Sequence, residues 1–199
     1  MCAKVALTAK NILELEDVSQ IYDEYFEPLF KEVELLKEPL AQKSLALISF
    51  FSRIDKNNRE LCDFIFESLN VEESKFWEIC YALHESELVD LFEQQVVKIS
   101  DQIFSTYIFY KAVIENETLS FSFFLNNYLD YENRITDTIV PVINTFNYRQ
   151  IEKKLKPLIL KKWLDIEKEG STQNSLKYLD LFWFYLSVNF NSIIYHHFS

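Results

Sequence analysis

Glycine is almost absent from this chain: Gly170 is the only one in 199 residues. Loops that cradle phosphates or dinucleotides, and the sharp turn that presents a serine nucleophile in many hydrolases, need several glycines close together. A single glycine excludes all of these loops within this sequence. We therefore expect a non-catalytic module rather than an enzyme, without a cofactor of its own.

Cysteine is also scarce, and its spacing excludes two common roles. Cys2, Cys62 and Cys80 are odd in number and form no C-x-x-C pair, which suits a reducing compartment rather than a disulfide framework. Met1 is not followed by the basic segment and long apolar stretch of a secretion signal. The expected location is the cytoplasm.

Long uninterrupted apolar runs are missing as well. The most apolar stretch, residues 181–186, lies between Asp180 and Asn189 and falls short of the roughly 18 residues that a membrane helix needs. A helix that is buried or faces a partner explains this stretch better. No membrane association is expected.

Apolar and aromatic residues are abundant, at 49% and 16% of the chain. They are sufficient for a substantial core in one or two small domains. Because Leu, Glu, Lys, Ile and Phe dominate while Gly and Pro are few, helices joined by short polar turns are favoured over a many-stranded sheet. The expected fold class is mainly α.

Negative charge dominates, and it is unevenly distributed. The net charge is −11; residues 1–115 hold 22 acidic and 11 basic side chains, whereas residues 116–199 hold nine of each. Nucleic-acid binding relies on clustered Lys and Arg that displace counterions from phosphates. We therefore expect no nucleic-acid partner.

The middle of the chain has the pattern of a winged-helix-like domain. Apolar residues at helical spacing predict three short helices within residues 40–85, and β-branched runs at residues 88–92 and 96–100 predict a hairpin. Ser100 or Asp101 is placed to cap the apolar helix that follows. Three helices followed by a two-stranded wing are typical of a winged-helix domain.

Charges around the third of these helices argue against its use in reading DNA. Lys75 is its only supporting base, and a phosphate backbone would be repelled by the carboxylates nearby. These carboxylates belong to Glu72, Glu73, Glu78, Glu85 and Glu87.

These patterns divide the chain into three parts: residues 1–39, a winged-helix-like domain at 40–115, and a helical region at 116–199. In the first part, Pro28 and Pro39 are placed to mark the start and the end of a helix. This part resembles an incomplete helical unit rather than a self-sufficient domain.

The last part returns to helical spacing and resembles the opening pairs of an antiparallel helical array. Gly170 marks its longest loop, and the apolar face near the end is expected to form an interaction surface through Trp183, Phe184 and Phe190. Helices are expected at residues 119–129, 135–146, 151–166 and 176–194, with Pro141 and Pro157 at early turns or kinks.

Two histidine-containing groups have the residue types of a metal site but not its arrangement. Cys80 and His84 are four residues apart on one helix, yet no second pair accompanies them. His196 and His197 are adjacent, so they cannot both face one metal from a regular helix. The sequence predicts no metal site.

Carboxylate pairs such as Asp23 and Glu27 would do acid–base work only if they were buried. Nothing in their sequence surroundings indicates burial. We expect these charges to lie on a solvated helix face.

The chain has one basic cluster, and several of its members would share a helix face. It could meet an acidic partner or the acidic front of this same chain, but plain solvation is the default interpretation. Its members are Arg149, Lys153, Lys154, Lys156, Lys161 and Lys162.

A family resemblance emerges around the hairpin and at both ends of the chain. Residues 97–107, Val-Lys-Ile-Ser-Asp-Gln-Ile-Phe-Ser-Thr-Tyr, resemble the end of the winged helix in STAND-class (NACHT/NB-ARC-like) signal-transduction P-loop NTPases. Residues 1–6 and 17–26 are similar to the lid helices of bacterial members. Residues 181–186 resemble the first helices of their sensor array.

This resemblance implies a middle segment of such an NTPase, without its nucleotide-binding core. In relatives that bind ATP or ADP, a Met-His-Asp triplet lets the His approach a phosphate; it would map onto Ile99, Ser100 and Asp101. Ser100 replaces the His, and Asp101 has a second interpretation as a helix cap. The resemblance thus assigns Ser100 and Asp101 to a nucleotide only in an intact NTPase.

The leading hypothesis is a regulatory and protein-interaction module that holds an NTPase core closed and relays partner binding, with antiviral defence as its setting. Its partner would be another protein or that core. The alternative is a free-standing helical binding or dimerisation protein, a homo-oligomer that associates through its C-terminal aromatic residues. A small helical enzyme lacks a convincing set of catalytic residues.

Overall fold

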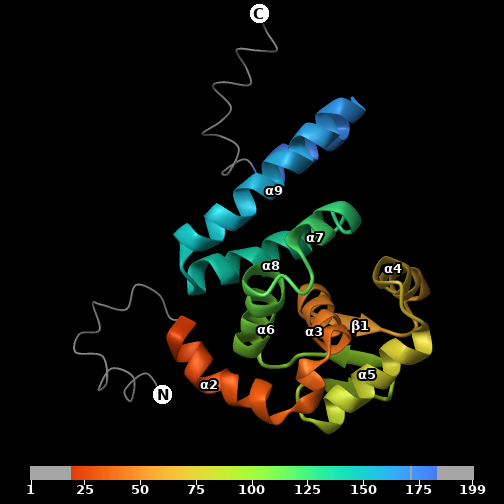
Figure 1. Cartoon of the computed structure of the whole chain (residues 1–199). Coiled ribbons are helices and arrows are strands. Elements are labelled where there is room, and N and C mark those ends of the chain that lie inside the picture. Colours follow the sequence, from red (N-terminus) through yellow and green to blue (C-terminus); the bar gives the residue numbers. More distant parts are fainter. Residues whose placement is uncertain (1–18, 171, 183–199) are drawn as a thin grey trace, which may run out of the picture.

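The computed structural model describes residues 19–170 and 172–182, and these are mainly α-helical, as the composition predicts (Figure 1). In chain order the elements are α2 (Ser19–Glu32), the 3-10 turn η2 (Glu34–Lys37), α3 (Pro39–Phe51), β1 (Arg53–Asp55), α4 (Arg59–Leu69), α5 (Glu73–Glu85), β2 (Asp90–Phe92), β3 (Val96–Lys98), α6 (Gln102–Phe109), the π-helical turn η3 (Tyr110–Glu115), α7 (Phe121–Asn127), α8 (Glu132–Thr145) and α9 (Tyr148–Glu169). Residues 172–182 are also helical. One small antiparallel sheet packs against α3, α4 and α5.

Helix α3 forms the centre of the fold. Every residue from Ser44 to Phe51 is buried, which is the pattern of a helix that is covered on all sides. Helices α5, α6 and α8 and the strands β1 and β3 all pack against it. Figure 1 shows α3 between the sheet and the helices that follow in the chain.

The sheet has the strand order β1-β3-β2, with both pairings antiparallel. In the central strand, Val97 lies opposite Ile54 of β1 and Leu91 of β2, and both Val97 and Ile54 are fully buried. The predicted order of three helices and a hairpin is present, and β1 is an addition. The sequence did not reveal β1 because a three-residue strand with one apolar residue has no detectable period.

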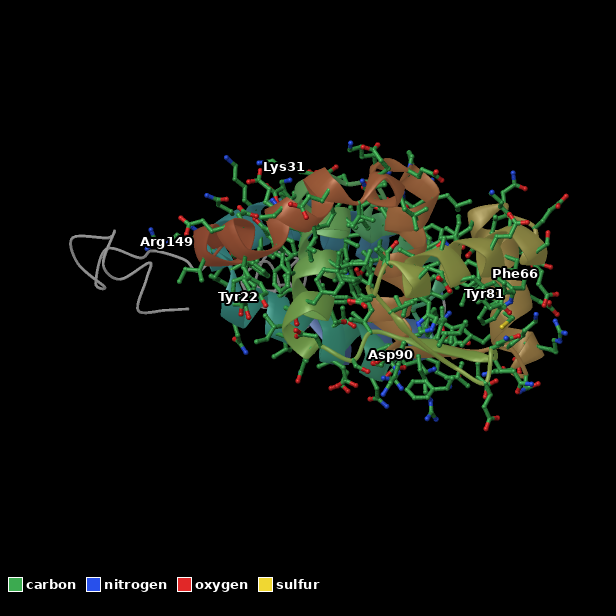
Figure 2. All side chains as sticks on the ribbon, turned by 90° about the horizontal axis from the view of Figure 1, so that it is seen from below. Tyr22, Lys31, Phe66, Tyr81, Asp90 and Arg149 are labelled. Atoms are coloured by element: carbon green, nitrogen blue, oxygen red, sulfur yellow. The ribbon has the colours of Figure 1, made fainter. Side chains whose placement is uncertain are left out.

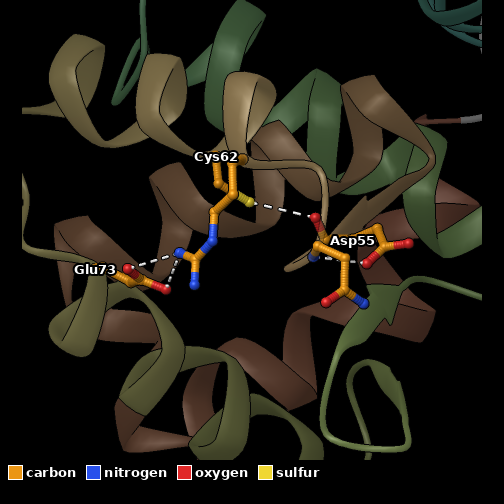
Figure 3. Close-up of polar contacts among 5 residues, drawn as sticks. Asp55, Cys62 and Glu73 are labelled. Carbon is orange, nitrogen blue, oxygen red and sulfur yellow. Dashed lines mark hydrogen bonds and ion pairs between the residues drawn. The ribbon is translucent and has the colours of Figure 1, made fainter.

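Local contacts fix the turn between β1 and α4 (Figure 3). The Asp55 carboxylate accepts a hydrogen bond from the backbone N–H of Asn57 at 2.8 Å, and the backbone carbonyl of Asp55 accepts one from the Cys62 thiol at 3.3 Å. The Arg59 guanidinium donates to both carboxylate oxygens of Glu73, at 2.8 and 3.0 Å. This bidentate pair joins α4 to α5.

The two N-terminal prolines do not bracket a helix. Pro28 lies inside α2, and Pro39 is the first residue of α3. The prediction for Pro39 was wrong because a proline at the first helical position loses only an N–H that has no partner within the helix. The segment between them ends α2 and forms only the short turn η2.

The predicted C-terminal helices are present with shifted bounds, as α7, α8 and α9. Pro141 and Pro157 lie in the interiors of α8 and α9 rather than in their early turns. Gly170 ends α9 in a left-handed conformation, with φ at 72°, where a residue with a Cβ would be strained. Figure 1 shows α9 stacked beyond α7 and α8, away from α4 and α5.

Aromatic rings join α3 to the C-terminal helices. Phe50 lies 4.8 Å from Phe124 and 5.7 Å from Tyr128, measured between ring centroids. The Tyr128 hydroxyl is 2.7 Å from that of Ser68 on α4. Burial raises the pKa of Tyr128 to about 12, with the Ser68 hydroxyl acting in the opposite direction.

Two buried serines of α3 predict stability changes of opposite sign. Ser49 donates to the Ser105 carbonyl at 2.8 Å, whereas the Ser44 hydroxyl has no hydrogen-bond partner among the described residues. We expect Ser49→Ala to lower the free energy of unfolding by about 1 kcal/mol and Ser44→Ala to raise it by a few tenths to about 1 kcal/mol. Urea unfolding followed by circular dichroism measures both. Equal losses of stability in the two variants would contradict the assignment of a hydrogen bond to Ser49 and of none to Ser44.

Tyr128 predicts a loss of stability at alkaline pH. Its folded pKa lies above that of the unfolded chain, so the folded state holds the proton longer and stability falls as pH rises from about 10 to about 12. From about pH 9 to about pH 11, the free energy of unfolding should fall by about 1 kcal/mol less in Tyr128→Phe than in the unmodified chain. Urea unfolding at the two pH values measures this difference. Tyr25→Phe, at an exposed tyrosine, is the control. A Tyr128→Phe variant with the unmodified pH dependence would refute this explanation.

Candidate functional site

A cavity of about 530 Å³ lies between α2 and the segments that flank the hairpin of β2 and β3. Tyr25, Phe26 and Leu29 of α2 form one wall. The rest of the lining comes from two segments. Residues 87–90 run into the start of β2, and residues 99–101 together with Phe104 run from β3 into α6. We call it the α2 cavity. It is the place where the structure puts both residues that the family resemblance singled out, Ser100 and Asp101.

The α2 cavity combines an apolar floor with an acidic rim. Phe26, Leu88, Val89 and Phe104 are buried in the core beneath it. The carboxylates in its lining belong to Glu87, Asp90 and Asp101, and the lining contains no Lys, Arg or His. The electrostatic potential at the opening is therefore negative.

Ser100 and Asp101 have defined local partners. The Ser100 hydroxyl donates to the Asp90 carboxylate. Asp101 accepts from the amides of Ile103 and Phe104, at 2.8 and 3.1 Å, and so caps the N-terminus of α6. Of the two interpretations of Asp101, the structure confirms the helix cap.

The residues that line this cavity do not suit a phosphate group. Phosphate sites in proteins use cationic side chains or clustered amide donors, whereas this lining holds three carboxylates and no cation. The amides of Ile103 and Phe104 already donate to Asp101. The nucleotide role of Ser100 and Asp101 stays a prediction that applies to an intact NTPase only.

A partly buried polar group holds α2 against α6 and η3. We call it the Asp23 cluster: Asp23 accepts from the Tyr107 hydroxyl at 2.8 Å and pairs with Lys111 Nζ at 2.8 Å, and Lys111 also pairs with Glu115 at 2.6 Å. Tyr107 is fully buried, and Phe26 packs on its ring at a centroid distance of 4.9 Å. These contacts fix the α2 wall of the cavity.

The Asp23 cluster shifts the proton affinities of its members. Burial, assisted by the Asp23 carboxylate, raises the pKa of Tyr107 well above its ordinary value. Burial acts to lower the pKa of Lys111, but hydrogen bonds to Asp23 and Glu115 offset this, so that the pKa is raised overall. Tyr107 therefore stays a neutral donor and Lys111 a cation at neutral pH.

Asp23 corrects one expectation from the sequence, since it is not simply part of a solvated helix face. Its side chain is 36% exposed and pairs with Tyr107 and Lys111. Glu27 does follow the expectation: it is exposed and pairs only with the exposed Lys31, one turn further along α2. The sequence missed the role of Asp23 because its partners come more than 80 residues later, where no local spacing reveals them.

The groups with metal-ligand residue types do not form a site among the described residues. Cys80 is buried, whereas His84 is exposed and its Nδ1 lies 3.0 Å from the Val89 carbonyl. No group of three or more potential ligands occurs within residues 19–170 and 172–182. His196 and His197 lie outside the described residues.

Helix α5 presents an acidic face with aromatic residues at its edge. Tyr81 and Phe92 are 37% and 48% exposed, and Lys98 lies over the Phe92 ring. In Figure 2, Phe66 and Tyr81 lie toward one end of the molecule, while Tyr22 and Arg149 lie toward the other. The exposed carboxylates here belong to Glu72, Glu78, Glu85 and Glu87.

The basic cluster on α9 has one structural member. Lys154 Nζ donates to the carbonyls of Ile114 and Glu115 at the end of η3, at 2.5 and 3.2 Å. It thereby supplies hydrogen-bond donors to carbonyls at the end of a helical turn. Lys153 and Lys161 are exposed on the outer side of α9, as plain solvation predicts. In Figure 2, Arg149 lies toward the end of the molecule opposite Tyr81 of α5.

An apolar cavity of about 240 Å³ lies between α8 and the helical residues 172–182. Ile139 and Ile143 of α8 line it together with Leu181 and Phe182. The predicted interaction residues follow directly in the sequence but lie outside the described residues. They are Trp183, Phe184 and Phe190.

No helix in the described ranges is both long and apolar enough to cross a membrane. Comparison of the chain with protein-family models, with curated proteins and with solved structures finds no match. The case for a function therefore depends on the chain's own residues.

Exchange of carboxylate for amide on α2 tests the Asp23 cluster. Asp23→Asn weakens a partly buried ion pair and should lower the free energy of unfolding by about 1–2 kcal/mol. Glu27→Gln, the same chemical change at an exposed pair on the same helix, should change it by less than about 0.5 kcal/mol. Urea unfolding gives both values. Equal changes in the free energy of unfolding would show that the Asp23 contacts stabilise the fold no more than an exposed ion pair does.

Proposed function

We propose that this chain is a non-catalytic regulatory and protein-interaction module in the cytoplasm, resembling the lid, winged-helix and early sensor part of a bacterial STAND-class NTPase. In such a protein it would restrain the nucleotide-binding core and relay the binding of a partner. Antiviral defence is the setting that we propose for this role.

The observation that carries the proposal is the α2 cavity and the way α2 forms its wall. Helix α2 packs on α6 through the Asp23 cluster, and the cavity opens where the two meet. A partner segment in this cavity would contact the lid-like helix and the winged-helix-like unit together. Occupancy of the cavity would thus influence the position of α2, which is what a relay requires.

The surface chemistry supports a protein partner over a nucleic acid. The exposed face of α5 and the rim of the α2 cavity are both acidic, and a phosphate backbone would be repelled there. The exposed aromatic side chain of Tyr81 on this acidic helix suits a basic and apolar protein surface.

The apolar cavity beside α8 favours a second candidate, a free-standing helical binding or dimerisation protein. Val140 and Tyr148 line this cavity and are 46% and 37% exposed, and Leu176 nearby in the chain is 62% exposed. Exposed apolar residues around a cavity are typical of an interface. Light scattering separates the two: a dimer that dissociates in Val140→Asp would favour this candidate, and a monomer favours the first.

ATP turnover tests the non-catalytic character of the chain. We expect the purified chain with Mg-ATP to release phosphate no faster than the buffer, because no phosphate-binding loop is encoded. Asp101→Ala should leave this background unchanged and lower the free energy of unfolding by about 1 kcal/mol, through loss of the α6 cap. Turnover by the unmodified chain that disappears in Asp101→Ala would contradict the proposal.

A further inference from the structure

We infer that the α2 cavity binds an arginine side chain carried by an extended segment of a partner protein. This inference depends on the proposed function and names the chemistry of the partner. It combines three properties of the same cavity: its size, its apolar floor and the sign of its rim.

The size and the floor suit a long side chain together with its neighbours. A volume of about 530 Å³ is within the range of ligand-binding cavities and exceeds what one small ion needs. Phe26, Val89 and Phe104 offer apolar surface, against which the methylene stem of an arginine would pack while its charged end stays at the rim.

The rim suits a cation, and a guanidinium in particular. Glu87, Asp90 and Asp101 all contribute carboxylates to the lining, which contains no basic side chain. A guanidinium pairs with carboxylates through two parallel hydrogen bonds, and it also stacks on aromatic rings. Tyr25, 53% exposed in the α2 wall, supplies such a ring.

A protein segment fits this cavity better than a free small cation. The apolar lining extends from Leu29 on α2 to Ile99 beside the sheet, so it offers surface for the residues that flank the arginine. A small cation would use the carboxylates and leave this apolar surface in water. The acidic excess in residues 1–115 also attracts basic protein segments over a longer range.

The test is an NMR titration of the full ¹⁵N-labelled chain with the peptide acetyl-Leu-Arg-Leu-amide. We expect a Kd on the order of 1 mM, with shifts concentrated in residues 25–29, 87–90 and 99–104. The same peptide with citrulline, which is neutral and nearly isosteric, should bind about tenfold more weakly. Agmatine, which carries the guanidinium without flanking residues, should also bind more weakly than the peptide.

Matched variants locate the site. The double variant Glu87→Gln, Asp90→Asn should weaken the arginine peptide about tenfold and leave the citrulline peptide unaffected. Glu85→Gln also removes a carboxylate but lies outside the cavity lining, so it should keep nearly full affinity. Leu29→Trp fills the cavity from the α2 side without any change of charge, and it should abolish binding while circular dichroism stays unchanged.

Several results would overturn the inference. Equal affinity for the arginine and citrulline peptides would show that the rim carboxylates do not recognise the guanidinium. Equal affinity of the double variant and the unmodified chain for the arginine peptide would show the same. Equal binding of agmatine would assign the cavity to a free organic cation. The absence of chemical-shift changes at peptide concentrations several times the expected Kd would exclude the site. Each of these leaves the ATP-turnover test untouched, so failure here is distinguishable from failure of the proposed function.

Discussion

The burial of α3 on every side is the constraint on which the other elements depend. A helix whose residues 44–51 are all inaccessible must be covered by several partners, and α5, α6, α8 and the sheet supply this cover. Helix α2 is not among the main partners of α3. It packs instead on α6 and η3 through the Asp23 cluster and aromatic contacts such as that of Phe26 with Tyr107.

This layered arrangement explains how a fold with one glycine presents a cavity. The α2 cavity forms where the added helix meets the segments before β2 and after β3. The segment before β2 turns with a non-glycine residue in the left-handed region, Glu87 at a φ of 58°. Glu87 therefore contributes a charge to the rim where a glycine is the more usual residue.

Much of the fold was predictable because helical spacing is a local signal. The stripes of α4 and α5, the hairpin of β2 and β3, and the Asp101 cap all follow from residues within a few positions of one another. Strand β1 was not predictable, because its evidence is the pairing of Ile54 with Val97, far along the chain. The prolines were misplaced for a related reason: Pro28 is tolerated within α2, and sequence alone does not show when tertiary contacts permit this.

The candidate site was only partly predictable. Ser100 and Asp101 were identified through a family resemblance, and both line the α2 cavity. Tyr25, Leu29 and Asp90 were missed because a cavity is made by segments that meet only after folding. The partners of Asp23 were hidden in the same way, since an aspartate among exposed neighbours gives no signal of a tyrosine and a lysine on another helix.

We infer that α2 is a separable layer, held on the core by the Asp23 cluster. Native-state hydrogen exchange followed by mass spectrometry measures this separability. We expect amides in residues 21–32 to exchange faster than those of α3, and Asp23→Asn to accelerate only the exchange of the α2 amides. Joint acceleration of α2 and α3, or an α2 that does not respond to Asp23→Asn, would contradict it.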